Sequence, residues 1–297
     1  MEWWLVPFLI VSIPYGVVIG ALFLWLKRDK AGKRRSPLTR DLLRAPGQSL
    51  DAKLQSEELD PSVYLFIAPL TPLFLYTLYL SSRFYNHTPF SPLSLVVNVV
   101  AGVGVVVYCV FKLIQIAKTR LKYRLGLEAE MAAGQELNQL LRSGYWVFHD
   151  LPAENFNIDH VVVGSNGVFA LETKGRAKPG KDVKDAWKVK YDGERLLFPG
   201  WTETKPLAQA ERQAKWLQQW LSSAVGEPVG VRPVLVLPGW WVERTSPKGM
   251  PVINAKNPEK LFRSLGKTQL SDKLVQQIVH QLDQRCRNVS ARAYAAD

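Results

Sequence analysis

Cysteine is scarce in this sequence, and its scarcity excludes two common kinds of site. The 297 residues contain only two cysteines, Cys109 and Cys286. A disulfide framework or a structural zinc site needs several cysteines, or cysteines with histidines, at short and regular spacing. Neither kind of site is therefore expected, and the two distant thiols fit a reducing cytoplasmic compartment.

Acidic residues are also few relative to basic ones. There are 26 Asp and Glu against 38 Lys and Arg, which gives a formal charge of +12. Such an excess suits an anionic partner, but lipid headgroups and nucleic acid both qualify. The charge alone therefore does not separate a membrane surface from nucleic acid.

Charged residues are almost absent from three long apolar runs in the first 117 residues. A helix that crosses a bilayer needs about 20 apolar residues. The runs cover residues 3–26, 63–80 and 93–117. We expect three transmembrane helices, although the shorter second run contains Pro69 and Pro72 and could instead be re-entrant.

The first run does not have the features of a cleaved signal peptide. It begins "MEWW", without a basic start, and it is longer than a signal core and is followed by "KRDKAGKRR". We expect a retained anchor over residues 1–26. The spacing of Gly16 and Gly20 would let two such helices pack closely, so a homo-oligomer through the transmembrane helices is one expected assembly.

Basic residues in the loops predict the orientation of these helices. Eight Lys and Arg lie between Lys27 and Arg44, and four more follow the third run within residues 118–125. The loop from Ser81 to Pro92 contains only Arg83. By the positive-inside rule the N-terminus is outside, whereas the basic loop 27–62, the linker 118–125 and everything that follows are cytoplasmic.

A helical pattern begins at Gly126 and includes one acidic residue on its apolar side. The apolar arc consists of Leu127, Met131, Gly134, Leu137 and Leu141. Glu130 falls inside this arc, where an unpaired carboxylate is costly. It is therefore either a site residue or a rim glutamate that reaches water or an arginine.

The stretch "NIDHVVVGSNGVFALETKG", residues 157–175, predicts a β-hairpin with charged side chains near its open end. A Ser165–Asn166 turn would place Asp159 opposite Glu172, and an Asn166–Gly167 turn would place it opposite Lys174. Both turns put these three side chains on one face, whereas a three-residue loop would send Asp159 to the other face.

Two carboxylates facing each other in a sheet repel unless a cation lies between them. Carboxylate oxygens suit Mg²⁺ or Mn²⁺ better than zinc, and Mg²⁺ completes its shell with water and phosphate. Lys174 would then lie beside the attacking water or the phosphate. The hairpin therefore predicts a divalent-metal site that acts on a phosphodiester.

A basic segment follows the hairpin. Its cations are Lys174, Arg176, Lys178, Lys181, Lys184, Lys188 and Lys190. They could follow a nucleic-acid backbone, form a solvated loop or contact anionic lipid. The remaining chain predicts a strand over residues 145–149, a helix over 207–221, a buried strand over 231–237, closing helices from 256 and over 270–282, and a frayed tail over 286–297.

The order of "GLEAE" and the hairpin sequence resembles the NERD family, the nuclease-related domain, over residues 126–224. That family is grouped with PD-(D/E)XK restriction-endonuclease-like proteins. The resemblance implies an α/β fold in which helices flank a restriction-endonuclease-like mixed sheet, with the core order helix–strand–strand–strand–helix–strand. This domain would cover residues 126–285, after the three transmembrane helices.

The resemblance also assigns roles to residues. It implies that Glu130, Asp159 and Glu172 bind the metal and that Lys174 is catalytic. Gln209 matches the glutamine of the family's Asn-Pro-x-x-Gln helix start, although Lys205 replaces the asparagine, and Ala129 stands where a glycine is frequent.

We therefore expect a multi-pass protein of a bacterial cytoplasmic membrane that hydrolyses nucleic acid with Mg²⁺ or Mn²⁺. DNA is the first expected substrate and RNA the second. A nuclease at the cytoplasmic membrane fits a role in defence against incoming DNA or in the processing of that DNA. The rival interpretation is an inactive module that binds nucleic acid or protein, and a third is a membrane sensor or channel with a soluble effector.

Overall fold

The computed structural model describes residues 37–85, 89, 91–266 and 268–290, together with 13, 16–18, 20, 21, 23 and 24. Two compact units are present. One contains residues 57–119, and the other contains residues 40–56 and 120–290.

The first unit contains two long apolar helices. They are α3 (Ser62–Tyr85) and α4 (Pro92–Leu137), and both are long and apolar enough to cross a membrane. Helix α3 continues through Pro69 and Pro72, and many of its large apolar side chains are exposed. The predicted first span, residues 3–26, lies largely outside the described residues.

Helix α4 extends beyond the predicted third span. It continues from Pro92 through the predicted linker 118–125 and ends at Leu137, where the 3-10 helix η3 (Asn138–Ser143) follows. One helix therefore supplies both an apolar membrane-length segment and the first helix of the α/β unit.

A mixed five-stranded sheet forms the centre of the second unit. Its order is β10-β8-β4-β3-β2, in which β2, β3 and β4 are antiparallel neighbours and β4, β8 and β10 are parallel. The bounds are β2 Trp146–Pro152, β3 Asn157–Gly164, β4 Gly167–Thr173, β8 Val231–Val236 and β10 Val252–Ile253. The core order helix–strand–strand–strand–helix–strand is present.

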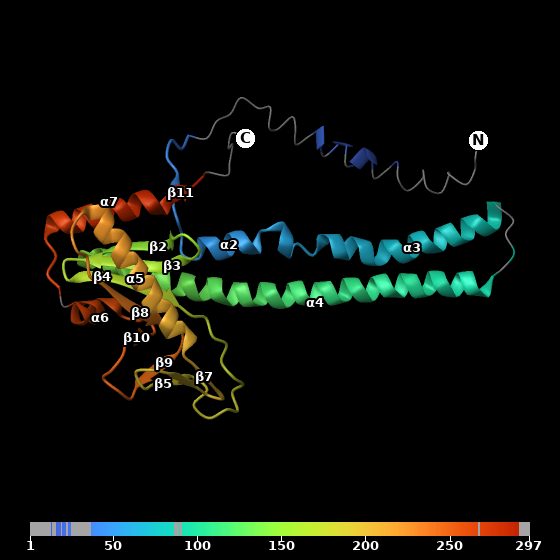
Figure 1. Cartoon of the computed structure of the whole chain (residues 1–297). Helices are drawn as coiled ribbons and strands as arrows, with labels where there is room; N and C mark the ends of the chain where they lie inside the picture. Colours follow the sequence, from blue (N-terminus) through green and yellow to red (C-terminus); the bar gives the residue numbers. More distant parts are fainter. Residues whose placement is uncertain are drawn as a thin grey trace. The chain divides into compact units, whose positions relative to one another are not determined.

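Helices cover both faces of this sheet (Figure 1). Helices α5 (Lys205–Val225) and α7 (Asp272–Cys286) pack on one face, where Val161, Leu217 and Ile278 are fully buried. The C-terminal part of α4, η3 and α6 (Pro258–Leu265) pack on the other face. Burial on both faces explains why β4 is apolar throughout except at its end.

A second, four-stranded sheet was not predicted. It has the order β7-β6-β5-β9, with bounds β5 Lys188–Tyr191, β6 Leu196–Phe198, β7 Trp201–Glu203 and β9 Trp241–Arg244. Its strands have only three or four residues each, which is too short for a clear alternation in the sequence. Tyr191, Phe198 and Trp240 bury its inner face.

The predicted apolar arc of the first helix was partly wrong. Met131 and Leu141 are exposed by 44% and 51%, whereas Ala129, Glu130 and Ala133 are buried. Small alanines let the sheet approach this side of the helix, and the change to a 3-10 helix at Asn138 turns Leu140 inward instead of Leu141.

Two chain segments outside the predicted domain also belong to the α/β unit. Residues 40–56, predicted as part of the cytoplasmic loop 27–62, pack within it and contain β1 (Leu42–Leu43) and α2 (Gln48–Leu54). Strand β1 pairs antiparallel with β11 (Arg287–Val289), in the predicted frayed tail. Sequence patterns could not indicate a two-residue strand formed by such distant segments.

A buried histidine pair joins β2 and β3. His149 Nδ1 lies 2.9 Å from His160 Nδ1, and His149 Nε2 lies 3.0 Å from Asn138 Oδ1. Burial lowers the pKa of His149 from 6.5 to about 4 and that of His160 well below 6.5. Both imidazoles are therefore neutral in the folded protein at neutral pH.

The histidine pair predicts a stability loss in mild acid. Below about pH 6.5 the two histidines bind protons in the unfolded chain but stay neutral in the folded protein. The unfolding free energy therefore falls as the pH is lowered towards 4. We expect His149→Asn to flatten this dependence by up to about 1.4 kcal/mol per pH unit, measured by unfolding between pH 5 and 7. Substituting the exposed His280 should leave the unfolding free energy unchanged. An equal slope in wild type and His149→Asn would contradict a neutral pair.

Candidate active site

The hairpin β3–β4 adopts one of the two predicted registers. His160 pairs with Leu171, Val162 with Phe169 and Gly164 with Gly167, as expected for a Ser165–Asn166 turn. Gly167 has φ +139, a value that a side chain would disfavour. The Asn166–Gly167 alternative and the three-residue loop are therefore wrong.

The pairing of β3 with β4 ends just before Asp159. The ladder stops at His160 and Leu171, and Asp159 does not continue it opposite Glu172. Asp159 Oδ2 instead accepts a hydrogen bond of 2.6 Å from the backbone N–H of Thr173. The carboxylate thus reaches across to the end of β4, where the other charged side chains begin.

Glu172 and Lys174 form an ion pair at the end of β4. Lys174 Nζ contacts Glu172 Oε1, and Glu172 is only 1% exposed. The parallel neighbour β8 fixes this end of the strand, because Lys174 N–H donates to Val236 O at 2.9 Å. A glutamate and a lysine two residues apart therefore share one face, as strand alternation predicts.

Helix α4 brings Glu130 to the same place. Glu130 is 8% exposed, and a close approach of α4 to the end of β4 is possible because Gly175 has no side chain. A Cβ atom on Gly175 would lie 2.6 Å from Leu125 O and 3.0 Å from Ala129 Cβ. Ala129, at the position where the resemblance leads us to expect a glycine, is therefore one of the α4 residues that lie against Gly175.

Three carboxyl groups interact electrostatically at this point. Burial raises the pKa of Glu130 to about 8, and repulsion from Asp150 and Glu172 adds to this shift. Burial also raises the pKa of Asp159 well above its usual value, with repulsion from Glu172 and Glu130. Burial raises the pKa of Glu172 as well, although Lys174 opposes this. Because these shifts favour the protonated carboxyl groups, a cation bound here would have to displace protons as well as pair with the carboxylates.

Gln213 is a polar residue of this site that the sequence analysis missed. It is 3% exposed on α5, hydrogen-bonds to Glu172 and donates from Nε2 to Asn157 O at 3.2 Å. Gln209, which the resemblance selected, lies one helical turn earlier and is half-buried. The sequence shows that Gln209 and Gln213 are four residues apart and so lie on one side of the helix. Only the packing of α5 against β4 shows that Gln213 is the one that lies at Glu172.

The oxygen atoms of the site fit a divalent cation only in part. Glu130 Oε2 and Glu172 Oε2 are buried without hydrogen-bond partners. Such orphaned carboxylate oxygens are costly and suit a hard cation. However, no group of three or more His, Cys, Asp or Glu side chains among the described residues is arranged to hold one metal ion.

The predicted basic segment divides into paired and exposed cations. Arg176 makes two hydrogen bonds to Glu203, of 2.8 and 2.7 Å, and Lys188 Nζ lies 3.4 Å from Glu243. The exposed members are Lys178, Lys181, Lys184 and Lys190. Most of this segment lies outside helices and strands, a conformation that fits all three predicted alternatives.

Several of the tryptophans that the structure describes contribute to packing. Trp240 is 1% exposed and donates to Arg176 O, so it belongs to the core. Trp216 and Trp220 stack on each other with Arg285 over both rings. Trp146, Trp187 and Trp241 are instead exposed, by 43%, 49% and 57%.

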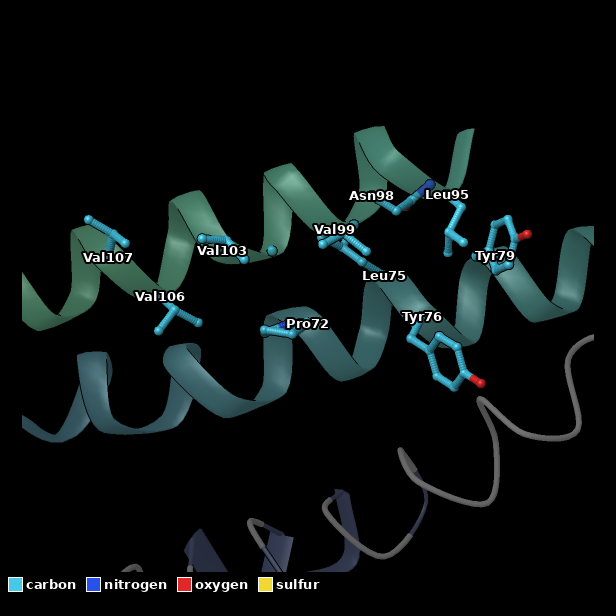
Figure 2. A pocket seen from close by; sticks show the side chains of 11 residues that line it. Pro72, Leu75, Tyr76, Tyr79, Leu95, Asn98, Val99, Val103, Val106 and Val107 are labelled. Atoms are coloured by element: carbon cyan, nitrogen blue, oxygen red, sulfur yellow. The ribbon is translucent and has the colours of Figure 1, made fainter. Parts of the chain in front are cut away.

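A separate apolar groove lies between α3 and α4 in the first unit (Figure 2). Its volume is about 390 Å³, and Pro72, Tyr76, Tyr79 and Asn98 are among the residues that line it. No Asp, Glu, Lys, Arg or His side chain lines this groove.

The close approach of α4 to β4 predicts the effect of one small substitution. Gly175→Ala should destabilise the α/β unit by about 1–3 kcal/mol, because the methyl group meets the α4 backbone, which cannot move freely. Thermal or denaturant unfolding measures this loss. Gly180→Ala, in the same loop with open space around it, is the matched control. Equal stability of the two variants would show that α4 does not approach β4 so closely.

One comparison with known proteins gives a match. Residues 125–238 match the family model described as the nuclease-related domain, NERD. Comparison with curated proteins and with solved structures gives no match. The matched residues include α4 from residue 125, the hairpin and α5, which together carry Glu130, Asp159, Glu172, Lys174 and Gln213. Residues 125–238 of this chain are therefore similar to the nuclease-related domain family.

Proposed function

We propose that the protein is a divalent-metal-dependent nuclease whose site consists of Glu130, Asp159, Glu172 and Lys174. The observation that carries this proposal is the gathering of three interacting carboxyl groups and one amine at the end of β4, inside a nuclease-related domain. We also propose that the α/β unit has the fold of restriction-endonuclease-like proteins.

Mg²⁺ or Mn²⁺ is the proposed cofactor. Mg²⁺ in phosphoryl-transfer sites is usually held by one or two carboxylates, while water and phosphate complete its coordination. Glu172 and Asp159 would hold it, and Glu130 would complete the acidic set. When bound, the ion would supply positive charge that stabilises the charge developing on a phosphodiester.

Lys174 and Gln213 have roles that follow from their contacts. The Lys174 amine touches Glu172, so it is held where it can orient an attacking water or stabilise phosphate charge. Gln213 bridges Glu172 and the start of β3, and this would fix the glutamate's orientation. Gln209 remains a proposed site residue on the resemblance alone.

The two membrane-length helices support a membrane anchor. We propose that the α/β unit lies on the cytoplasmic face, as the positive-inside rule predicts, and that the first 26 residues form a further span. DNA is the proposed substrate ahead of RNA, and defence against incoming DNA or its processing is the proposed role. A homo-oligomer through the transmembrane helices stays a prediction.

Two isosteric substitutions test the site. Glu172→Gln and Lys174→Met should each lower the turnover of plasmid DNA with Mg²⁺ or Mn²⁺ by about 100-fold or more, because each removes a charge that acts in the transition state. Glu172→Gln should not lower the unfolding temperature, since it relieves repulsion among buried carboxyl groups. Glu227→Gln, an exposed substitution at the end of α5, is the control.

The outcomes separate the proposed nuclease from its rival. Cutting that survives both substitutions would rule out this site. Binding of nucleic acid that both substitutions leave unchanged, without any cutting by the wild type, would instead indicate an inactive binding module.

The exposed lysines predict a salt dependence. If Lys178, Lys181, Lys184 and Lys190 contact phosphates, changing all four to alanine should reduce the slope of log K against log salt by up to about 0.9 per lysine on duplex DNA. Fluorescence anisotropy at several salt concentrations measures the slope. A control variant replaces four exposed lysines elsewhere, namely Lys215, Lys256, Lys260 and Lys273. Equal slopes in the two variants would remove this segment from the nucleic-acid interface.

A further inference from the structure

The segment Arg40–Ser56, here called the inter-span segment, packs on the nuclease-related domain although it lies outside the family match. In the sequence it lies between the predicted first span and α3, and the match begins only at residue 125. In the structure it belongs to the same compact unit as residues 120–290.

The first anchor of this segment is Asp150, a buried residue of β2. Arg44 donates to Asp150 Oδ2 from Nε at 2.8 Å and from Nη2 at 2.6 Å. Ser49 donates its backbone N–H to the same oxygen at 2.9 Å and its hydroxyl to Oδ1 at 2.7 Å. Because Asp150 is 1% exposed, its charge depends on these donors and on Asn157 Nδ2 at 3.1 Å.

The second anchor is the C-terminal end of the α/β unit. Strand β1 pairs with β11, and Arg44 N–H donates to Cys286 O at 3.0 Å. The Arg44 side chain also donates from Nη1 to Asn288 Oδ1 at 3.2 Å. Arg44 thus ties the segment to β2 and to β11 together.

Glycines on α4 make room for the segment. A Cβ atom on Gly134 would lie 2.5 Å from Pro46 Cγ and 2.9 Å from Pro46 Cβ. A Cβ atom on Gly126 would lie 3.1 Å from Leu50 Cδ1. The segment therefore fits against α4 only because these two helix positions have no side chains.

The tip of the segment reaches the candidate active site. Gly47, which has φ +72, lies against α4, and a Cβ atom on it would be 3.7 Å from Glu130 Oε2. The Gly47 backbone also acts on the Glu130 carboxyl group, because it opposes the rise in pKa that burial causes. Oε2 of this carboxyl group is buried and has no hydrogen-bond partner.

We propose that the inter-span segment is a positioning element for Glu130, so that the site is complete only when this segment is docked. The proposal rests on the proposed metal-dependent function. Docking places the Gly47 backbone against the carboxyl group and limits its rotation, and buried partners of this kind set the orientation of metal-binding carboxylates. A fragment that began at α4 would lack this element.

The test uses the full-length protein in detergent or in lipid nanodiscs. Gly134→Ala adds a methyl group where Pro46 lies, while alanine itself favours the helix. Gly126→Ala is a milder variant, because the end of the Leu50 side chain can move away. Gly230→Ala, with open space around it and no positive φ, is the matched control.

Two readouts do not depend on activity. Hydrogen exchange should show protected amides at Arg44 and Ser49 in the wild type and faster exchange there in Gly134→Ala, because their acceptors are lost on undocking. Mn²⁺ titration by calorimetry should show an affinity about 10- to 100-fold weaker in Gly134→Ala, with Gly126→Ala between it and the control. Turnover should fall through kcat while KM for DNA stays unchanged.

Each contrary outcome has a distinct meaning. Unprotected amides in the wild-type segment, or unchanged exchange in Gly134→Ala, would overturn the docking. A loosened segment with unchanged Mn²⁺ affinity, or with faster cutting, would overturn the positioning role alone. A wild type that neither binds Mn²⁺ nor cuts DNA would overturn the proposed function, and the positioning role with it.

Discussion

The close approach of α4 to the end of β4 is the constraint on which the candidate site depends. Gly175 permits it, and it places Glu130 of the helix beside Glu172 and Asp159 of the hairpin. Burying three carboxyl groups together is unfavourable unless cations or protons compensate, and Lys174 forms its ion pair with Glu172. This unbalanced burial is costly to stability, which is the usual mark of a functional site.

The rest of the α/β unit holds this cluster in place from several directions. Strand β8 fixes the end of β4 through the hydrogen bond from Lys174 N–H to Val236 O. Helix α5, which packs on one face of the sheet, supplies Gln213. The inter-span segment reaches Glu130 from a third direction. The site therefore combines residues that are far apart in the sequence, and its geometry depends on the packing of both faces of the sheet.

Helix α4 joins two chemical environments within one continuous element. Its first half is apolar and long enough to cross a bilayer, and its last turns carry Glu130 into the α/β unit. The residues predicted as a linker, 118–125, are therefore part of this helix.

The sequence by itself determined the hairpin, its charged end and the family, because alternation, turn residues and the order of the motif are local properties. It also showed the two apolar helices that the structure describes. Only the tertiary structure decided that Gln213 contacts Glu172, that Ala129 rather than Met131 is buried, and that residues 40–56 pack on the domain. These features arise from contacts between segments distant in the chain, and such contacts leave no periodic signal in either segment.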